Sequence, residues 1–192
     1  MSAASNLERR MSGAARVDLS SDRRIRGTAI VFNALSVDLG GFREIIKPEA
    51  VSRTIREGLD VRALVDHDTS KIIGRTRAGT LELSADHRGL RVVIDPPNTT
   101  YARDLMESLE RGDISGMSFG FRVLSDEWRM DDGGPIREVL DMSVSEVSIV
   151  GFPAYPTTDV QVALRSLDQF RQTQAGNRLD YLRKWHRTRL AR

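Results

Sequence analysis

The sequence predicts an α+β fold dominated by β-strands, a barrel or sandwich with helical additions. Two observations lead to this prediction. Short apolar segments rich in β-branched residues recur through the middle of the chain, separated by Gly, Pro, Asn and Asp. Helical periodicity is clear in only two segments of the same region. No internal repeat is evident.

The first half of the chain predicts mostly strands. Structure is expected to begin at Ile25. The predicted strands cover Arg26–Phe32, Phe42–Ile46, Val61–Val65, Ile72–Thr76, Gly79–Leu83 and Leu90–Ile94. The segments 72–76 and 79–83 are expected to form a hairpin. Pro48 marks the start of a short helix that runs from Glu49 to Glu57 and is closed by Gly58.

The second half predicts the clearest helix and then strands. Asn98 is a good N-cap, and Gly112 supplies the stop. Between them the apolar residues follow i, i+3, i+4 and i+7 spacing at Ala102, Leu105, Met106 and Leu109. The predicted elements that follow are strands over 116–124, 136–140 and 144–150, a short strand or helix start over 160–164, and a helical, basic pattern from 165.

Length and charge predict one domain with two terminal segments. The chain has 192 residues, enough for one domain with its own core. Residues 1–24 are polar and expected to be flexible, residues 25–164 form the domain, and residues 165–192 form a basic helical or disordered tail. The three parts carry net charges of +2, −6 and +6. An acidic body argues against a nucleic-acid groove, and basic ends indicate segments that interact separately or are removed.

Composition excludes several classes of chemistry. There is no cysteine, so disulfides, Cys-ligated zinc and thiol nucleophiles are excluded. No apolar run approaches the length that spans a bilayer. The first residues lack the apolar core of a signal peptide, so a cytoplasmic location is expected. Because the chain has no thiol, any nucleophile must be a hydroxyl, a carboxylate or an amine.

The segment from Gly116 to Phe121 contains the candidate nucleophile. As a strand it directs Met117, Phe119 and Phe121 to one face and Ser118 and Gly120 to the other. The hydroxyl then lies beside a residue without a side chain, where a substrate backbone could approach. The alternative is a serine in a half-buried strand next to a bulge glycine.

Two further residues complete a candidate set of catalytic groups. His67 ends an apolar strand, so its backbone is held by the core while its ring lies at the rim. Glu146 is a carboxylate in an apolar strand and must face solvent or find a partner. With Ser118 they supply a nucleophile, a base and a group that orients the base. The alternatives are a solvated Asp-His-Asp turn at His67, which is also a weak metal-site signal, and an outward edge-strand glutamate.

Several blocks of sequence resemble a known family. They are Gly27–Asn33, the strand end at His67, Gly74–Thr76 with Gly79–Leu81, Tyr101–Leu105, Arg111–Phe121, and Glu146–Val150 with Pro153–Tyr155. In this order they resemble the prohead proteases of HK97-type tailed phages, which have a herpesvirus-protease-like fold. The resemblance covers about residues 26–164.

The resemblance implies a fold, a site and a role. The fold would be a closed or nearly closed, mostly antiparallel β-barrel with surrounding helices. Ser118 would be the nucleophile, His67 the general base and Glu146 the acid, with Asp66, Asp68 and Asp141 as possible substitutes for the acid. Backbone N–H groups near Ser118, or Arg75, would stabilise the oxyanion. No cofactor or metal is implied.

The same resemblance implies substrates and a location. The enzyme would be a serine endopeptidase that cleaves the capsid protein precursor and scaffold, and then itself, inside the assembling prohead in the bacterial host cytoplasm. A homo-oligomer is expected, with no membrane and no specific nucleic acid as partner. Two alternatives remain: a non-catalytic capsid-assembly or scaffolding module of the same fold, and a nucleic-acid-binding β-barrel.

Overall fold

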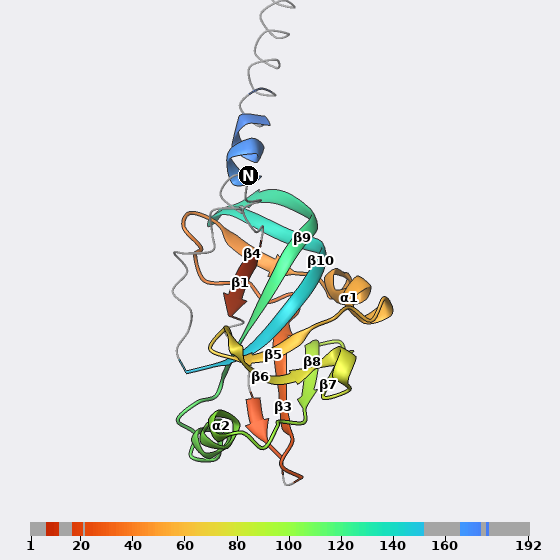
Figure 1. The fold of residues 1–192 in the computed structure, drawn as a ribbon. Coiled ribbons are helices and arrows are strands. Elements are labelled where there is room, and N and C mark those ends of the chain that lie inside the picture. Colours follow the sequence, from red (N-terminus) through yellow and green to blue (C-terminus); the bar gives the residue numbers. More distant parts are fainter. Residues whose placement is uncertain (1–6, 12–16, 21, 152–165, 174–175, 177–192) are drawn as a thin grey trace, which may run out of the picture.

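The computed structural model describes residues 7–11, 17–20, 22–151, 166–173 and 176 (Figure 1). They form two β-sheets with short helices at the periphery. Sheet A contains six strands: β1 (Glu8–Met11), β4 (Arg43–Ile46), β5 (Arg62–Val65), β6 (Asp68–Arg75), β9 (Gly116–Asp131) and β10 (Gly134–Val150). Sheet B contains four: β2 (Val17–Leu19), β3 (Ile25–Val31), β7 (Leu81–Ala85) and β8 (Gly89–Ile94).

Strand β10 is the centre of sheet A. Along one side it pairs antiparallel with β9 over nearly its whole length. Along the other side it pairs in parallel with two shorter strands, β4 at Ile136–Val139 and β5 at Glu146–Ile149. The order across the sheet is β1-β9-β10-β5-β6, so β1 and β6 are its outer strands.

The helices are short and lie outside the sheets. A 3₁₀ turn, η1 (Pro48–Val51), leads into α1 (Ser52–Arg56), and η2 (Thr76–Ala78) connects β6 to β7. The longest helix is α2 (Thr100–Glu110), which packs its apolar side against β2 and β6 and ends two residues before Gly112, where φ is +80°. Gly112 thus serves as the predicted stop, whereas the N-cap is Thr99 and not Asn98.

One hydrophobic core joins the two sheets. It includes Ile25 and Ile30 from β3, Leu90 from β8, and Met117, Phe119 and Phe121 from β9, all essentially inaccessible to solvent. The predicted alternation along the Ser118 strand is therefore confirmed, because its three large apolar residues are buried together.

The β-rich α+β class is confirmed, but the predicted barrel is wrong. Neither sheet closes, since the strand orders run from β1 to β6 and from β2 to β7 without returning to their starting edge. The physical reason lies in the turn η2. It carries the chain out of sheet A at Arg75 and into sheet B at Leu81, so the strands on either side of it cannot pair. The hairpin expected for 72–76 and 79–83 is wrong for the same reason.

Other differences concern element boundaries. Regular structure begins before Ile25, with β1 and β2 in the segment that was expected to be flexible. The strands predicted at 136–140 and 144–150 are one strand, β10, which passes through irregular pairing positions without ending. The element predicted for 160–164 lies outside the described residues.

Part of the predicted tail packs on the body. Residues 166–173 are helical, and Leu167 is completely buried against Leu39 and Phe42. Trp128 packs against the ring of Phe42, and Phe170 stacks on Trp128 with ring centroids 5.9 Å apart. These contacts form a small apolar cluster, separate from the main core.

Candidate active site

One face of the β9–β10 pair carries the polar candidates. Ser118 lies directly opposite Ser148, and Gly120 lies directly opposite Glu146. Residues opposite one another across an antiparallel pair share a face, so these four line the side of the sheet away from the phenylalanine core. The pairing shifts between Val144 and Glu146, which leaves Val144 in the core while Glu146 faces the other way. Regular period-2 alternation would have put Val144 and Glu146 on one face, and this irregularity separates them.

His67 lies in a tight turn at the end of β5. Val65 pairs with Asp68, so Asp66 and His67 are the two residues of a hairpin loop, with φ of +48° and +60°. Positive φ at both positions is the signature of a type I′ turn and is uncommon for residues other than glycine. The turn is held by its neighbours, since the Asp66 N–H donates to the Ile149 carbonyl at 2.9 Å and the His67 N–H donates to Ser148 Oγ at 3.3 Å. The backbone conformation that aims His67 at β10 is therefore stabilised by β10 itself.

Glu146 binds the imidazole of His67. Its Oε1 lies 2.6 Å from His67 Nδ1 and accepts from Arg9 Nε at 3.3 Å, while Oε2 accepts from the Ser148 hydroxyl at 2.6 Å. Burial raises the pKa of the Glu146 carboxyl, but the hydrogen bonds from His67, Ser148 and Arg9 outweigh burial and hold the pKa below its usual value. A carboxylate in this position fixes the ring orientation of the histidine.

Gly120 makes room for the Glu146 side chain. A Cβ atom at this position would lie 2.7 Å from Glu146 Oε1 and 2.8 Å from Glu146 Cγ. The interpretation that this glycine leaves space for a substrate backbone is therefore wrong: the space is filled by the carboxylate that contacts His67.

Ser118 is buried beneath β1. Its side chain is inaccessible to solvent, and its hydroxyl donates to the backbone carbonyl of Arg10 at 2.8 Å. Strand β1 pairs with β9 in a register that sets Met11 opposite Ser118 and Arg9 opposite Gly120. Among the described residues the hydroxyl makes no hydrogen bond to His67, whose Nε2 is buried and has no partner. The structure thus joins His67 to Glu146 directly, and sets Ser118 on the same sheet face with its hydroxyl bound to β1.

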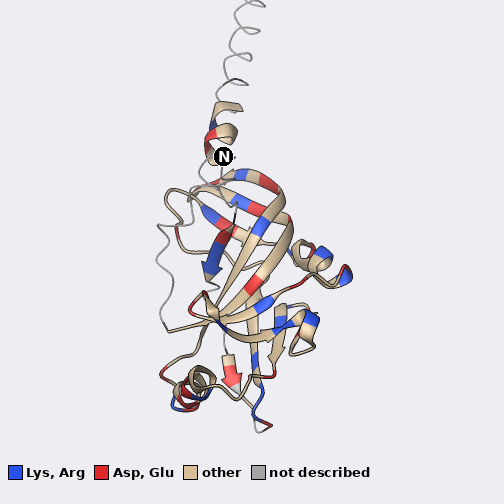
Figure 2. Ribbon diagram, viewed as in Figure 1, with Lys and Arg blue, Asp and Glu red and all other residues tan. Residues whose placement is uncertain are grey.

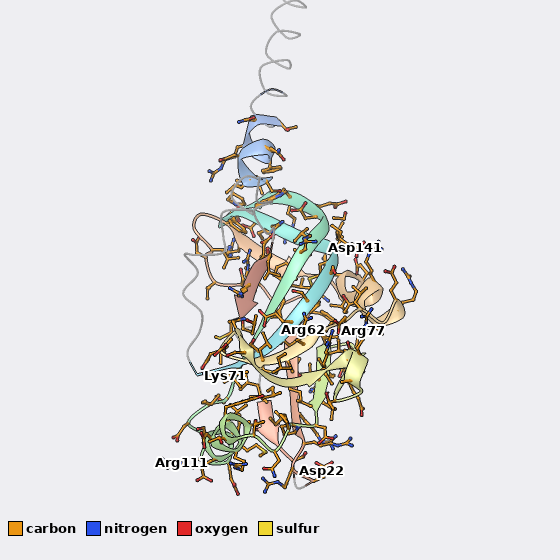
Figure 3. The ribbon with its side chains drawn as sticks, viewed as in Figure 1. Asp22, Arg62, Lys71, Arg77, Arg111 and Asp141 are labelled. Carbon is orange, nitrogen blue, oxygen red and sulfur yellow. The ribbon has the colours of Figure 1, made fainter. Side chains whose placement is uncertain are left out.

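The other candidate residues have different partners. Asp66 Oδ1 accepts from the Gly151 N–H, Asp68 binds Ser70 and Lys71, and Asp141 binds Arg53 of α1. Figure 3 labels Asp141 beside α1 and Lys71 near the β5–β6 turn. Arg75, named as a possible oxyanion donor, forms a bidentate ion pair with Asp60 at 2.8 and 2.6 Å.

Two residues that contact His67 or Glu146 were not identified from the sequence. Ser148 bridges the His67 backbone and Glu146, and Arg9 reaches Glu146 from the N-terminal strand. Period-2 spacing from Glu146 already puts Ser148 on the same face, so this residue could have been found. No sequence signal connects Arg9 with a residue 137 positions away.

Within the described ranges there is no group of three or more His, Asp or Glu side chains able to hold a metal ion. No helix in the part of the chain described is long and apolar enough to cross a membrane.

A hydroxyl and a carboxylate on paired strands, with an imidazole from an adjoining turn, are the groups that serine hydrolases use. Comparison with family models identifies the chain more closely: residues 11–173 match the caudovirus prohead serine protease family. The chain belongs to this family, as its resemblance predicted. Comparisons with curated proteins and with solved structures gave no match.

Family membership sets the general role. It supports a serine protease that acts in capsid maturation, inside the assembling capsid, with capsid protein as the implied substrate. The matched region extends beyond the predicted 26–164 at both ends and includes the helical residues 166–173 that pack on the body.

Proposed function

We propose that the chain is a prohead maturation endopeptidase that uses Ser118 as nucleophile, His67 as general base and Glu146 as the group that orients the base. The observation that carries this proposal is the 2.6 Å contact between His67 Nδ1 and Glu146. It leaves Nε2 as the free imidazole nitrogen, buried and without a partner among the described residues. Such a nitrogen is available to accept a proton from a nearby hydroxyl.

The proposed reaction proceeds through an acyl-enzyme. Ser118 Oγ attacks the scissile carbonyl carbon as His67 Nε2 takes the hydroxyl proton. His67 returns that proton to the leaving amine nitrogen, and water then hydrolyses the ester by the same proton transfers. Glu146, ionised because its pKa is lowered, stabilises the imidazolium formed in each step. Backbone N–H groups near Ser118 are the proposed oxyanion donors, because Arg75 is engaged by Asp60.

Capsid protein cleavage tests this assignment. The chain is co-expressed with a capsid protein from the same source, and the products are weighed by mass spectrometry. Ser118→Ala and His67→Ala are expected to lower cleavage by about 10⁴-fold or more while the fold is retained. Ser84→Ala and His87→Ala, both exposed positions, are the matched controls. Normal processing by either site variant would end the assignment, and a fully inactive wild type would favour a non-catalytic assembly module.

The proposal also covers the basic C-terminal tail and the oligomeric state. The tail from residue 165 is proposed to dock the enzyme on scaffold or to serve as a self-cleavage target, since it carries a net charge of +6 beside an acidic body. The enzyme is also proposed to act as a homo-oligomer on the scaffold in the host cytoplasm. Tail-deleted protein that is packaged and self-cleaved normally would remove the docking role.

A further inference from the structure

Strand β1 lies where an extended peptide substrate would lie. It occupies the outer edge of sheet A, pairs antiparallel with β9 beside Ser118, and carries basic residues along that edge (Figure 2). Strand addition to a sheet edge is a common way for a protein to bind a peptide, with the main chain giving affinity and alternate side chains giving specificity. Within the described residues, the Ser118 hydroxyl donates to one backbone group, the Arg10 carbonyl, at 2.8 Å. That carbonyl belongs to the peptide bond between Arg10 and Met11.

The Arg10 side chain fills a built pocket. It is 7% exposed and its guanidinium donates to Glu44 Oε1 at 3.1 Å and to the carboxylate of Glu8 at 2.6 Å. The guanidinium carbon also lies 5.6 Å from the centre of the Phe121 ring, within cation–π distance. Glu44 comes from β4 and Phe121 from β9, so the body of the protein supplies part of the pocket, and Glu8 of β1 supplies the other carboxylate. A planar, forked cation suits this combination of carboxylate and ring better than an ammonium group does.

A second body residue contacts β1 two positions earlier. Glu8 is inaccessible to solvent, and its two carboxylate oxygens accept from Arg137 Nη1 at 2.9 and 3.2 Å. Arg137 also binds Glu44 at 3.2 Å, which couples the two contact points. Charged side chains are seldom fully buried without such partners, so the body holds complementary charges for an acidic residue and for a basic residue two positions later.

We propose that β1 is a substrate strand bound in cis, that Arg10–Met11 is a self-cleavage bond, and that Glu44, Phe121 and Arg137 select extended segments of the form Glu-x-Arg with cleavage after the arginine. This inference rests on the proposed protease function and specifies its substrate class. The family match begins at Met11, so residues 8–10 lie outside the region that characterises the family.

The step is an ordinary hydrolysis. Ser118 Oγ bonds to the Arg10 carbonyl carbon, its proton moves to His67, and the bond to the Met11 nitrogen breaks as that nitrogen takes the proton. One water then cleaves the ester and gives Arg10 a carboxylate. The products are residues 1–10 and residues 11–192, and their separation uncovers Ser118 for other substrates.

The chain contains an internal control for this pattern. Glu127-Trp128-Arg129-Met130 repeats the arrangement of Glu8-Arg9-Arg10-Met11. Its backbone is paired with β10 inside sheet A, where it cannot reach Ser118 of the same molecule. Cleavage that depended on sequence alone would cut after Arg129 as well as after Arg10.

Intact-mass analysis of the purified full chain tests the cis-cleavage site. Wild type is expected to yield a species that begins at Met11, at a rate unchanged by about tenfold dilution, and Ser118→Ala is expected to stay intact. Arg10→Gln should slow this cleavage about tenfold or more, since a charged partner in the pocket is lost, whereas the exposed Arg111→Gln should not. A wild type that processes capsid protein but keeps residues 1–10, that cuts at another N-terminal bond, or whose rate falls with dilution would overturn the proposal.

Peptides supplied in trans test the pocket. Processed wild type is expected to hydrolyse a Glu-Ala-Arg-Met peptide with a kcat/KM about tenfold or more above that for Glu-Ala-Gln-Met, and Glu44→Gln should reduce this ratio. If Glu44→Gln does not fold by circular dichroism, the peptide pair with wild type still decides. Equal hydrolysis of both peptides would overturn the arginine pocket alone. Loss of all Ser118-dependent cleavage, of capsid protein included, would instead remove the protease assignment on which the pocket rests.

Discussion

Gly120 is required for the shape of the site, although it carries no functional group. The Glu146 carboxylate lies over its α-carbon at a separation that no side chain permits. From there the carboxylate reaches His67 at 2.6 Å and is itself bound by Ser148. The absence of one methyl group thus determines where the acid of the site can lie.

Gly120→Ala should therefore impair catalysis more than stability. The new methyl would push the carboxylate away from His67, and we expect kcat to fall by about 10²-fold or more, with the unfolding free energy lowered by about 1–3 kcal/mol. Gly133→Ala is the control, because only the flexible end of the Arg43 side chain lies in its way. Peptide hydrolysis and urea unfolding measure the two quantities. Unchanged kcat would show that Glu146 is not needed where it lies.

The buried Glu146 carboxylate should make stability depend on pH in a defined direction. Because its folded pKa lies below the ordinary value of 4.5, the ionised form is favoured by folding. Its contribution is fully present above about pH 4.5 and is lost as pH falls through the lowered folded pKa. Glu146→Gln should thus cost about 1–3 kcal/mol at pH 7 and less at pH 3, by urea unfolding at each pH. A difference that grew toward pH 3 would contradict this sign.

At the scale of elements, the sequence predicted most strands but not their partners. Apolar alternation located β3, β5, β8 and the start of β9. A strand with one buried face alternates apolar and polar residues, so this signal lies within the strand itself. Two elements were not predicted. The polar strand β1 has little apolar pattern because ion pairs and main-chain hydrogen bonds hold it. The turn η2 carries the chain from sheet A into sheet B, so the strands on either side of it pair with other strands.

The sequence named the residues of the candidate site but not the contacts between them. Ser118, His67 and Glu146 came from strand position and resemblance, since each needs a rigid backbone. The type I′ turn at His67 contains neither glycine nor asparagine, so an Asp-His-Asp turn could be read from the sequence but its left-handed backbone could not. The burial of Ser118 under β1 depends on residues 108 positions apart, which no local pattern reports.

The helical residues 166–173 should contribute measurably to stability. Leu167 is fully buried in the small cluster with Leu39 and Phe42, so Leu167→Ala should lower the unfolding free energy by about 2–3 kcal/mol. It should also shift Trp128 fluorescence to the red as the stacked Phe170 loosens. Gln169→Ala, at an exposed position of the same helical segment, is the control. Identical stability and emission for both variants would show that this segment does not pack on the body in solution.

At the scale of the whole molecule, the two sheets share one core. Residues of β3 and β8 in sheet B pack in the same cluster as those of β9 and β10 in sheet A. Neither sheet has a separate core of its own in the described part of the chain. The α+β, strand-rich body should consequently behave as one folding unit, although its sheets remain open.

Calorimetry can test whether the two sheets unfold together. The Ser118→Ala protein, which cannot process itself in the proposed mechanism, should unfold in a single transition with equal calorimetric and van't Hoff enthalpies. Ile30→Ala in sheet B and Phe119→Ala in sheet A should each lower the unfolding free energy by about 3–5 kcal/mol. Each should therefore move the single transition to a lower temperature. Two transitions, each sensitive to only one substitution, would contradict a shared core.

The edge position of β1 also has a kinetic consequence. A strand that belongs to the same chain competes for the β9 edge at an effective concentration on the order of millimolar, independent of how much enzyme is present. Until the proposed cleavage at Arg10–Met11 releases this strand, a capsid protein segment must reach a comparable concentration to displace it. The cis cleavage does not depend on concentration, so the N-terminal strand would delay proteolysis of other chains by a time that the enzyme itself sets.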